Sequence, residues 1–135
     1  MKYPIGIQSF EQIIEDGYVY VDKTDLVYKL THEGKIYFLS RPRRFGKSLL
    51  VSTLKNYYLG HKELFKGLKI DTLEKDWNVH PVFHVDFNGA NFTVPGELEQ
   101  KIRYHVSEWE KRYGLPCRKD ELGIGDRFAE VLRAA

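Results

Sequence analysis

The sequence has little of several things, beginning with cysteine: Cys117 is the single one among 135 residues. One thiol cannot form an internal disulfide framework, and it excludes a zinc cluster built from cysteines. An excess of one charge is also missing, because 21 lysines and arginines face 19 acidic residues, for a net charge of +2. That balance is too even to indicate nucleic-acid binding by itself.

Long apolar runs are absent as well. The longest, such as residues 36–39, are only a few residues, whereas a membrane-spanning helix needs about 20. The first residues, MKYPIGIQSFEQ, contain no apolar segment of the kind found in a secretory signal. We therefore expect a cytoplasmic protein that has no membrane partner.

The composition that remains is that of a soluble globular protein. Apolar residues make up 42% of the chain and charged residues 30%, which argues against intrinsic disorder. A chain of 135 residues is long enough for one domain and too short to suggest two. We therefore expect one domain over residues 1–135.

Several segments carry apolar residues at helical spacing between helix-start and helix-stop signals. Ser9 is a predicted N-cap, and glycines at positions 17, 60 and 114 are predicted helix ends. Asp22 or Thr24 is expected to cap a second helix. Helices are predicted from residue 10 to 15, from about 24 to 31, from 49 to 59, in part of 61–69, from 97 to 113 and from 125 to 132.

Three apolar segments predict β-strands instead. Residues 18–21 alternate aromatic and β-branched side chains, and residues 36–39 are a continuously apolar run of the kind buried on both faces inside a parallel sheet. Residues 82–85 predict a second such strand of the nucleotide fold. The helix predicted between the last two suggests a βαβ unit with a right-handed crossover. The expected fold class is α/β, an incomplete three-layer P-loop NTPase-like core. Either residues 18–21 join this sheet, or a partner supplies strands, or the chain is cut short.

Residues 41–48, reading RPRRFGKS, lie between the strand predicted at 36–39 and the helix predicted from Leu49. The segment ends in Gly-Lys-Ser, as a Walker A phosphate-binding loop does, but Arg41 stands where that loop has its first glycine. Gly46 permits close approach of the backbone to a phosphate, Lys47 can reach terminal phosphates, and the Ser48 hydroxyl can bind Mg²⁺. The alternative is an ordinary basic turn, but the strand–loop–helix order favours a nucleotide site.

This reading makes ATP and Mg²⁺ the expected ligands, with Lys47 as the candidate catalytic residue. The candidate nucleotide-binding residues are consecutive: Arg43, Arg44, Phe45, Gly46, Lys47, Ser48 and Leu49. Two alternatives stay open. The loop can serve a module that binds without hydrolysis, or its arginines can contact nucleic acid.

Asp86 is a second metal candidate, beside Ser48. It ends the apolar run at 82–85, as a Walker B acid ends its strand. The competing interpretation is a carboxylate that caps the following turn. Phe87 occupies the place of the glutamate that polarises water in AAA-type ATPases, so we expect little hydrolysis by this chain alone.

A stripe of apolar side chains marks one face of the helix predicted at 97–113: Leu98, Ile102, Val106 and Trp109. The stripe predicts core packing. If the sheet is incomplete, the same face can be left exposed and favour a homo-oligomer.

Four strings together resemble the bacterial AAA-ATPase-like family: YVDKT at 20–24, YFLSRPRRFGKSLL at 37–50, FKGL at 65–68, and Trp77 followed by the Pro81-Val82 pair. The resemblance implies that Arg41 belongs to the family's own form of the loop. It also implies that the residues 22–24 support the loop or lie near the nucleotide base, beside the helix-capping role. In this family the metal-binding acid lies on a later strand, which favours the turn-capping role of Asp86.

Members of that family usually continue into a Walker B strand ending in Asp-Glu-Tyr-Asp, and commonly into a restriction-endonuclease-like nuclease domain. This sequence contains neither. We therefore expect it to be the N-terminal part of such a protein, with nucleic acid as a partner only through the downstream domain.

Overall fold

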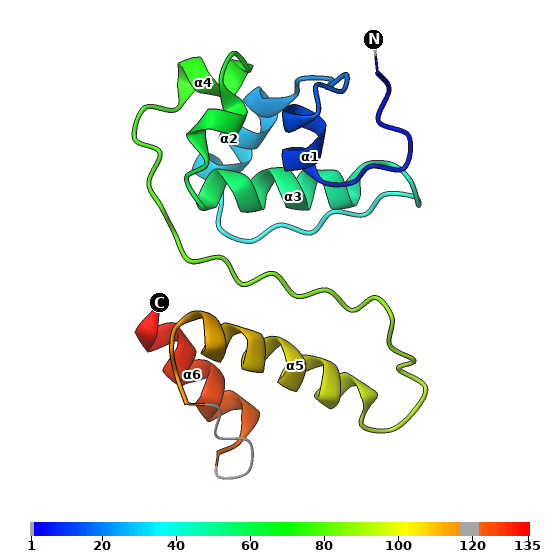
Figure 1. Ribbon diagram of the computed structural model, residues 1–135, viewed down its shortest axis with the longest axis vertical. Coiled ribbons are helices and arrows are strands. Elements are labelled where there is room, and N and C mark those ends of the chain that lie inside the picture. Colours follow the sequence, from blue (N-terminus) through cyan, green and yellow to red (C-terminus); the bar gives the residue numbers. More distant parts are fainter. Residues whose placement is uncertain (1, 117–121) are drawn as a thin grey trace. The chain divides into compact units, whose positions relative to one another are not determined.

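The computed structural model describes residues 2–116 and 122–135, so Cys117 lies outside the described residues. In this part the chain is helical (Figure 1). The elements in order are α1 (Phe10–Glu15), α2 (Thr24–Glu33), α3 (Lys47–Tyr58), the 3-10 helix η1 (Lys62–Phe65), α4 (Lys69–Leu73), α5 (Glu97–Arg112) and α6 (Ile124–Ala134). The chain divides into two compact units, Met1–Val82 and Phe83–Ala135, each described by itself.

The expected α/β fold is wrong for the described residues. The only β-type pairing among them is an isolated parallel bridge between Lys2 and Tyr18. The run at 36–39 was expected to be buried on both faces, yet Ile36 and Phe38 are 93% and 94% exposed. A strand is stable only when a neighbour pairs with its backbone and another layer covers its side chains. Among the described residues, no strand forms at 36–39, where the side chains of Ile36 and Phe38 lack a covering layer, nor at 82–85.

The predicted helix boundaries are confirmed where a local signal sets them. The Ser9 side chain accepts a hydrogen bond from the N–H of Gln12 and caps α1. Gly17, Gly60 and Gly114 follow the ends of α1, α3 and α5, each with a positive φ of 67° to 74°. Such glycines adopt the left-handed conformation that ends a helix without the strain of a Cβ.

The first unit packs its helices around an aromatic core. Its buried members come from four helices: Phe10, Val27, Leu64, Phe65 and Ile70. The rings of Phe10 and Phe65 lie 4.7 Å apart between centroids. Helix α1 packs against α3, and α2 against α4.

Helix α3 is held on several sides within this unit. Its side chains Leu50, Leu54 and Tyr57 pack against the core, and Thr53 is 1% exposed. The Ser52 hydroxyl oxygen accepts the N–H of Phe10, the first residue of α1, at 2.9 Å. The segment that leads into α3 is therefore attached to a firmly positioned helix.

The second unit is a pair of helices, α5 and α6, packed on each other. Val106, Trp109 and Val131 form its core, whereas Leu98 at the start of the predicted stripe is 51% exposed. The Arg127 guanidinium donates to both oxygens of the Glu110 carboxylate at 2.7 Å, and both side chains are buried. This bidentate pair joins the two helices. Among the described residues, no helix combines the length and the apolar character needed to cross a membrane.

Candidate functional site

The loop formed by residues 41–46 leads from an extended segment into α3. Gly46 is the N-cap of α3, with φ 74° and ψ 17°, and Arg44 also has a positive φ of 65°. Apart from the adjacent residues, no atom of the described part of the chain lies within 4 Å of the place a Cβ on Gly46 would occupy. Within the protein itself, conformation rather than space therefore selects glycine at this position.

The Lys47 side chain folds back over this loop. Its ammonium donates hydrogen bonds to the carbonyl oxygens of Arg41 and Pro42, the second at 2.9 Å. Lys47 is the first residue of α3, and side chains on a helix tilt toward its N-terminus, which directs this one across the loop. The Arg41 guanidinium completes the arrangement with a long contact, 3.5 Å, to the Phe45 carbonyl oxygen.

The start of α3 is rich in hydrogen-bond donors. The first N–H groups of any α-helix lack acceptors within the helix, and Gly46 offers no side-chain cap. The first turn contains no acidic residue, and Arg43 and Arg44 are exposed just before it. The partial positive charge of the helix N-terminus adds to these cations. Such an arrangement attracts an anion, most strongly one with several oxygens.

The consecutive candidates from Arg43 to Leu49 are thus brought together in one loop and one helical turn, with Ser48 exposed in that turn. Asp86, the other metal candidate, belongs to the second unit, whereas Ser48 belongs to the first. Among the described residues, no group of three or more His, Cys, Asp or Glu side chains could hold a metal ion.

Asp86 takes part in a turn. One oxygen of its carboxylate accepts the N–H of Asn88 at 2.9 Å. This hydrogen bond is the largest cause that holds the pKa of Asp86 below its usual value. The geometry matches the turn-capping interpretation, in which the carboxylate needs no metal.

The segment 22–24 connects two helices. One oxygen of the Asp22 carboxylate accepts the N–H of Thr24 at 2.9 Å and its hydroxyl at 2.7 Å, while the other accepts the N–H of Lys69 at 2.8 Å. The N-cap of α2 by position is Lys23, but its side chain makes no capping bond. Burial raises the pKa of the Asp22 carboxyl, but its hydrogen bonds outweigh burial and lower the pKa overall. Asp22 therefore joins the N-termini of α2 and α4.

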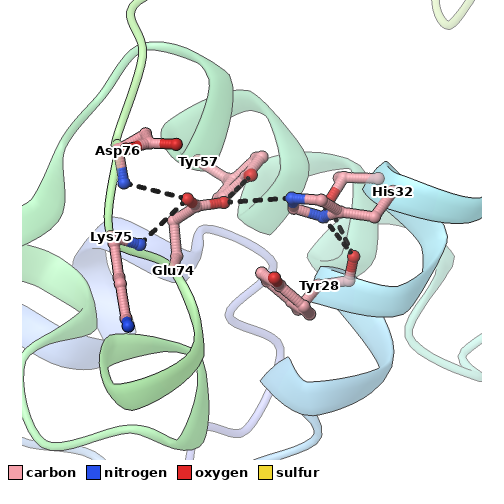
Figure 2. Close-up of polar contacts among 7 residues, drawn as sticks. Tyr28, His32, Tyr57, Glu74, Lys75 and Asp76 are labelled. Atoms are coloured by element: carbon pink, nitrogen blue, oxygen red, sulfur yellow. Dashed lines mark hydrogen bonds and ion pairs between the residues drawn. The ribbon is translucent and has the colours of Figure 1, made fainter.

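Sequence reasoning missed a polar cluster around Glu74, shown in Figure 2. Glu74 is 8% exposed and accepts backbone N–H groups of Lys75 at 3.0 Å and Asp76 at 3.1 Å. Its other oxygen accepts the Tyr57 hydroxyl and lies 3.6 Å from Nε2 of His32. No motif links these side chains, because they come from three separate segments.

The cluster shifts the pKa values of two of its members. Burial, followed by the hydrogen bond to Glu74, raises the pKa of Tyr57 to about 12. Burial alone would raise the pKa of Glu74, but the bonds from Tyr57 and the two N–H groups, with His32 nearby, lower it below its usual value. The cluster borders a pocket of about 190 Å³.

Comparison with known proteins gives one family and one curated relative. Residues 4–135 match the family described as "Predicted AAA-ATPase" (AAA-ATPase-like). The relative is an "Uncharacterized protein in vnfD 5'region" from Azotobacter chroococcum mcd 1, 43% identical over 136 residues, which cover 99% of this chain and 26% of that protein. No solved structure matches the chain. Because the family match extends over nearly all of the sequence, the chain belongs to the AAA-ATPase-like family.

Proposed function

We propose that residues 41–49 bind the phosphate groups of ATP or a related nucleotide, as the ATP-binding part of an AAA-type ATPase. The observation that carries this proposal is the position of the Lys47 ammonium over a loop that ends at the uncapped N-terminus of α3. A cation, a turn of donor N–H groups and a helix dipole then act on the same small volume.

The roles follow from chemistry and position. The backbone N–H groups from Arg43 to Leu49 donate to phosphate oxygens, and Lys47 neutralises charge on the terminal phosphates. The exposed Ser48 hydroxyl is the proposed ligand of Mg²⁺. Arg43 and Arg44 are exposed within the loop and add affinity for the same anion.

Hydrolysis needs more than phosphate binding by this loop. A residue must orient or activate the attacking water, and the loop itself supplies none. The chain spans only about a quarter, 26%, of the length of the curated relative. We therefore propose that this chain binds nucleotide with little turnover and that ATPase activity is a property of the longer protein.

Calorimetric titration with Mg²⁺–ATP tests the proposal. Lys47→Ala should weaken binding about tenfold or more, because hydrogen bonds from a charged group are worth about 1.5–3 kcal/mol. Lys55→Ala is the matched control, since Lys55 is an exposed lysine of the same helix outside the loop. Equal affinity of Lys47→Ala and the unmodified chain would overturn the assignment.

Two further titrations define the ligand. Ser48→Ala should reduce the dependence of ATP binding on Mg²⁺ while leaving binding of metal-free ATP nearly unchanged. A single-stranded oligonucleotide tests the arginines as a nucleic-acid contact. Tight oligonucleotide binding that persists in Lys47→Ala, without ATP binding, would favour that alternative.

A further inference from the structure

The pocket beside Glu74 is distinct from the loop at 41–46, and its lining is electronegative. It forms where α2 and α3 end, together with the segment that follows α4. Its lining includes the carboxylates of Glu74 and Asp76 and contains no lysine or arginine. The C-terminal ends of two helices add partial negative charge. In Figure 2 the Lys75 side chain extends away from the Glu74 carboxylate.

In its neutral form, His32 presents an acceptor to the Glu74 carboxylate, so that two acceptors face each other. Nδ1 of His32 lies 2.8 Å from the Tyr28 carbonyl oxygen, so Nδ1 must carry a hydrogen. In the neutral ring, Nε2 then presents a lone pair to the Glu74 oxygen 3.6 Å away. Two facing acceptors are stabilised by a donor that serves both, and a nitrogen cation with several N–H groups supplies that donor.

The Glu74 carboxylate can take another hydrogen bond. A carboxylate has about four acceptor positions, and the bonds from Tyr57, Lys75 and Asp76 occupy three of them. The position left over is on the oxygen nearest His32, where the pocket lies.

Aromatic rings supply the rest of the wall. Tyr57 and Tyr58 lie edge to face with centroids 5.1 Å apart, and His80 lies edge to face with Tyr58 at 5.8 Å. The N–H of His80 bonds to the Tyr58 carbonyl oxygen at 2.7 Å, which holds the segment after α4 against α3. Carboxylates combined with aromatic faces are typical of sites for organic cations.

The segment at 76–80, which forms one side of the pocket, contains a strained residue. Trp77, between the lining residues Asp76 and Asn78, has a φ of 40°, which is unfavourable for a bulky side chain. Its buried indole N–H has no hydrogen-bond partner among the described residues. The Trp77 ring packs against the rings of Tyr57 and Phe65, with 5.7 and 5.2 Å between ring centroids, and this packing holds the residue in place. Strained residues of this kind concentrate at ligand sites.

We propose that this pocket binds a guanidinium or alkylammonium group, which donates to Glu74 and His32 and lies against the tyrosine rings. A volume of about 190 Å³ suits such a head group with a short alkyl chain and is too small for a nucleotide. The cation can belong to a free amine or to an arginine or lysine side chain. The site is separate from the proposed nucleotide loop and does not depend on it.

Titration followed by NMR tests the proposal, with butylguanidinium as the free cation and the capped tripeptide Gly-Arg-Gly as the side-chain source. Butylurea has a similar shape without the charge and is the ligand control. We expect saturable shifts at His32, Tyr57 and Trp77 with a guanidinium ligand and none with butylurea. A preference for butylguanidinium or for the tripeptide identifies the source. No saturable shift with either, or equal binding of butylurea, would overturn the proposal.

Variants add a second test. Glu74→Gln should weaken guanidinium binding about tenfold, through loss of a charged hydrogen bond, and Asp76→Asn about threefold. Asp76 is exposed, so its variant keeps the test valid if Glu74→Gln does not fold. Glu63→Gln removes an exposed carboxylate of η1 outside the pocket and should leave affinity unchanged. Unchanged affinity in Asp76→Asn, or an equal loss in Glu63→Gln, would refute a specific site.

Discussion

The hydroxyl oxygen of Thr24 accepts the backbone N–H of Ile70 at 3.0 Å, although 46 residues separate the two. Both residues are fully buried. The same hydroxyl donates its hydrogen to Asp22 at 2.7 Å. The Thr24 hydroxyl therefore accepts a hydrogen bond from a buried N–H at the start of α4 and also has an acceptor for its own hydrogen.

Thr24→Val should destabilise the first unit by about 1–3 kcal/mol, because it keeps the side-chain shape but leaves the Ile70 N–H buried without an acceptor. Thr24→Ser retains the hydroxyl and should cost clearly less. Urea denaturation followed by Trp77 fluorescence measures both. Equal loss in the two variants would show that packing of the methyl group, rather than the hydrogen bond, accounts for the effect.

Tyr57 predicts a loss of stability at alkaline pH. Its pKa rises from 10.0 to about 12 in the folded chain, so the folded state holds the proton more tightly than the unfolded state. This contribution is fully present below pH 10 and is lost as the pH rises toward about 12. Denaturation midpoints measured across that range should fall more for the unmodified chain than for Tyr57→Phe. Parallel curves for the two proteins would contradict the assignment.

Removal of one partner from the Arg127–Glu110 pair should be costly. Arg127→Met leaves the Glu110 carboxylate, whose side chain is 4% exposed, without its main cation, at a cost of about 3–5 kcal/mol. The double variant Arg127→Met with Glu110→Met should be more stable than the single one. Denaturation followed by Trp109 fluorescence distinguishes them. A double variant less stable than the single would contradict this expectation.

Gly60 and Gly46 offer a matched comparison, since both have a φ of 74°. An alanine at either position meets the cost of a left-handed backbone, about 1–2 kcal/mol. At Gly60 the new Cβ would also lie 2.7 Å from Cγ2 of Val79, whereas at Gly46 no described atom beyond the adjacent residues lies within 4 Å of it. Gly60→Ala should therefore destabilise more, and adding Val79→Ala should remove the difference. Equal thermal midpoints for the two alanine variants would show that the contact with Val79 adds no destabilisation.

Helices could be predicted from this sequence because their signals are local. The Ser9 cap and the glycines at 17, 60 and 114 lie within a few residues of the ends they set. Whether a sheet forms could not be predicted from local signals. The run at 36–39 has the composition of a buried strand, but a strand also needs a pairing partner elsewhere, and composition does not reveal whether one exists.

The two candidate sites differ in the same way, because one is built from neighbouring residues and the other from residues far apart in the sequence. The residues of the loop are consecutive, so the fold of Lys47 over Arg41 and Pro42 follows from short-range geometry. The pocket cluster could not be found from sequence because Glu74 meets Tyr57 and His32 across 17 and 42 residues, and no spacing rule connects them. The nucleotide roles of the loop residues stay predictions.

The contacts of Lys47 have a consequence for affinity. The ammonium has three N–H donors, and two of them already bond to carbonyl oxygens of its own loop, so an arriving anion gains more than one of these hydrogen bonds only by displacing a carbonyl oxygen. Binding at this loop is an exchange of partners, and its free energy is the difference between two sets of bonds. Weakening the internal set, for instance by a loop change that moves the Pro42 carbonyl away, should tighten the grip on phosphate.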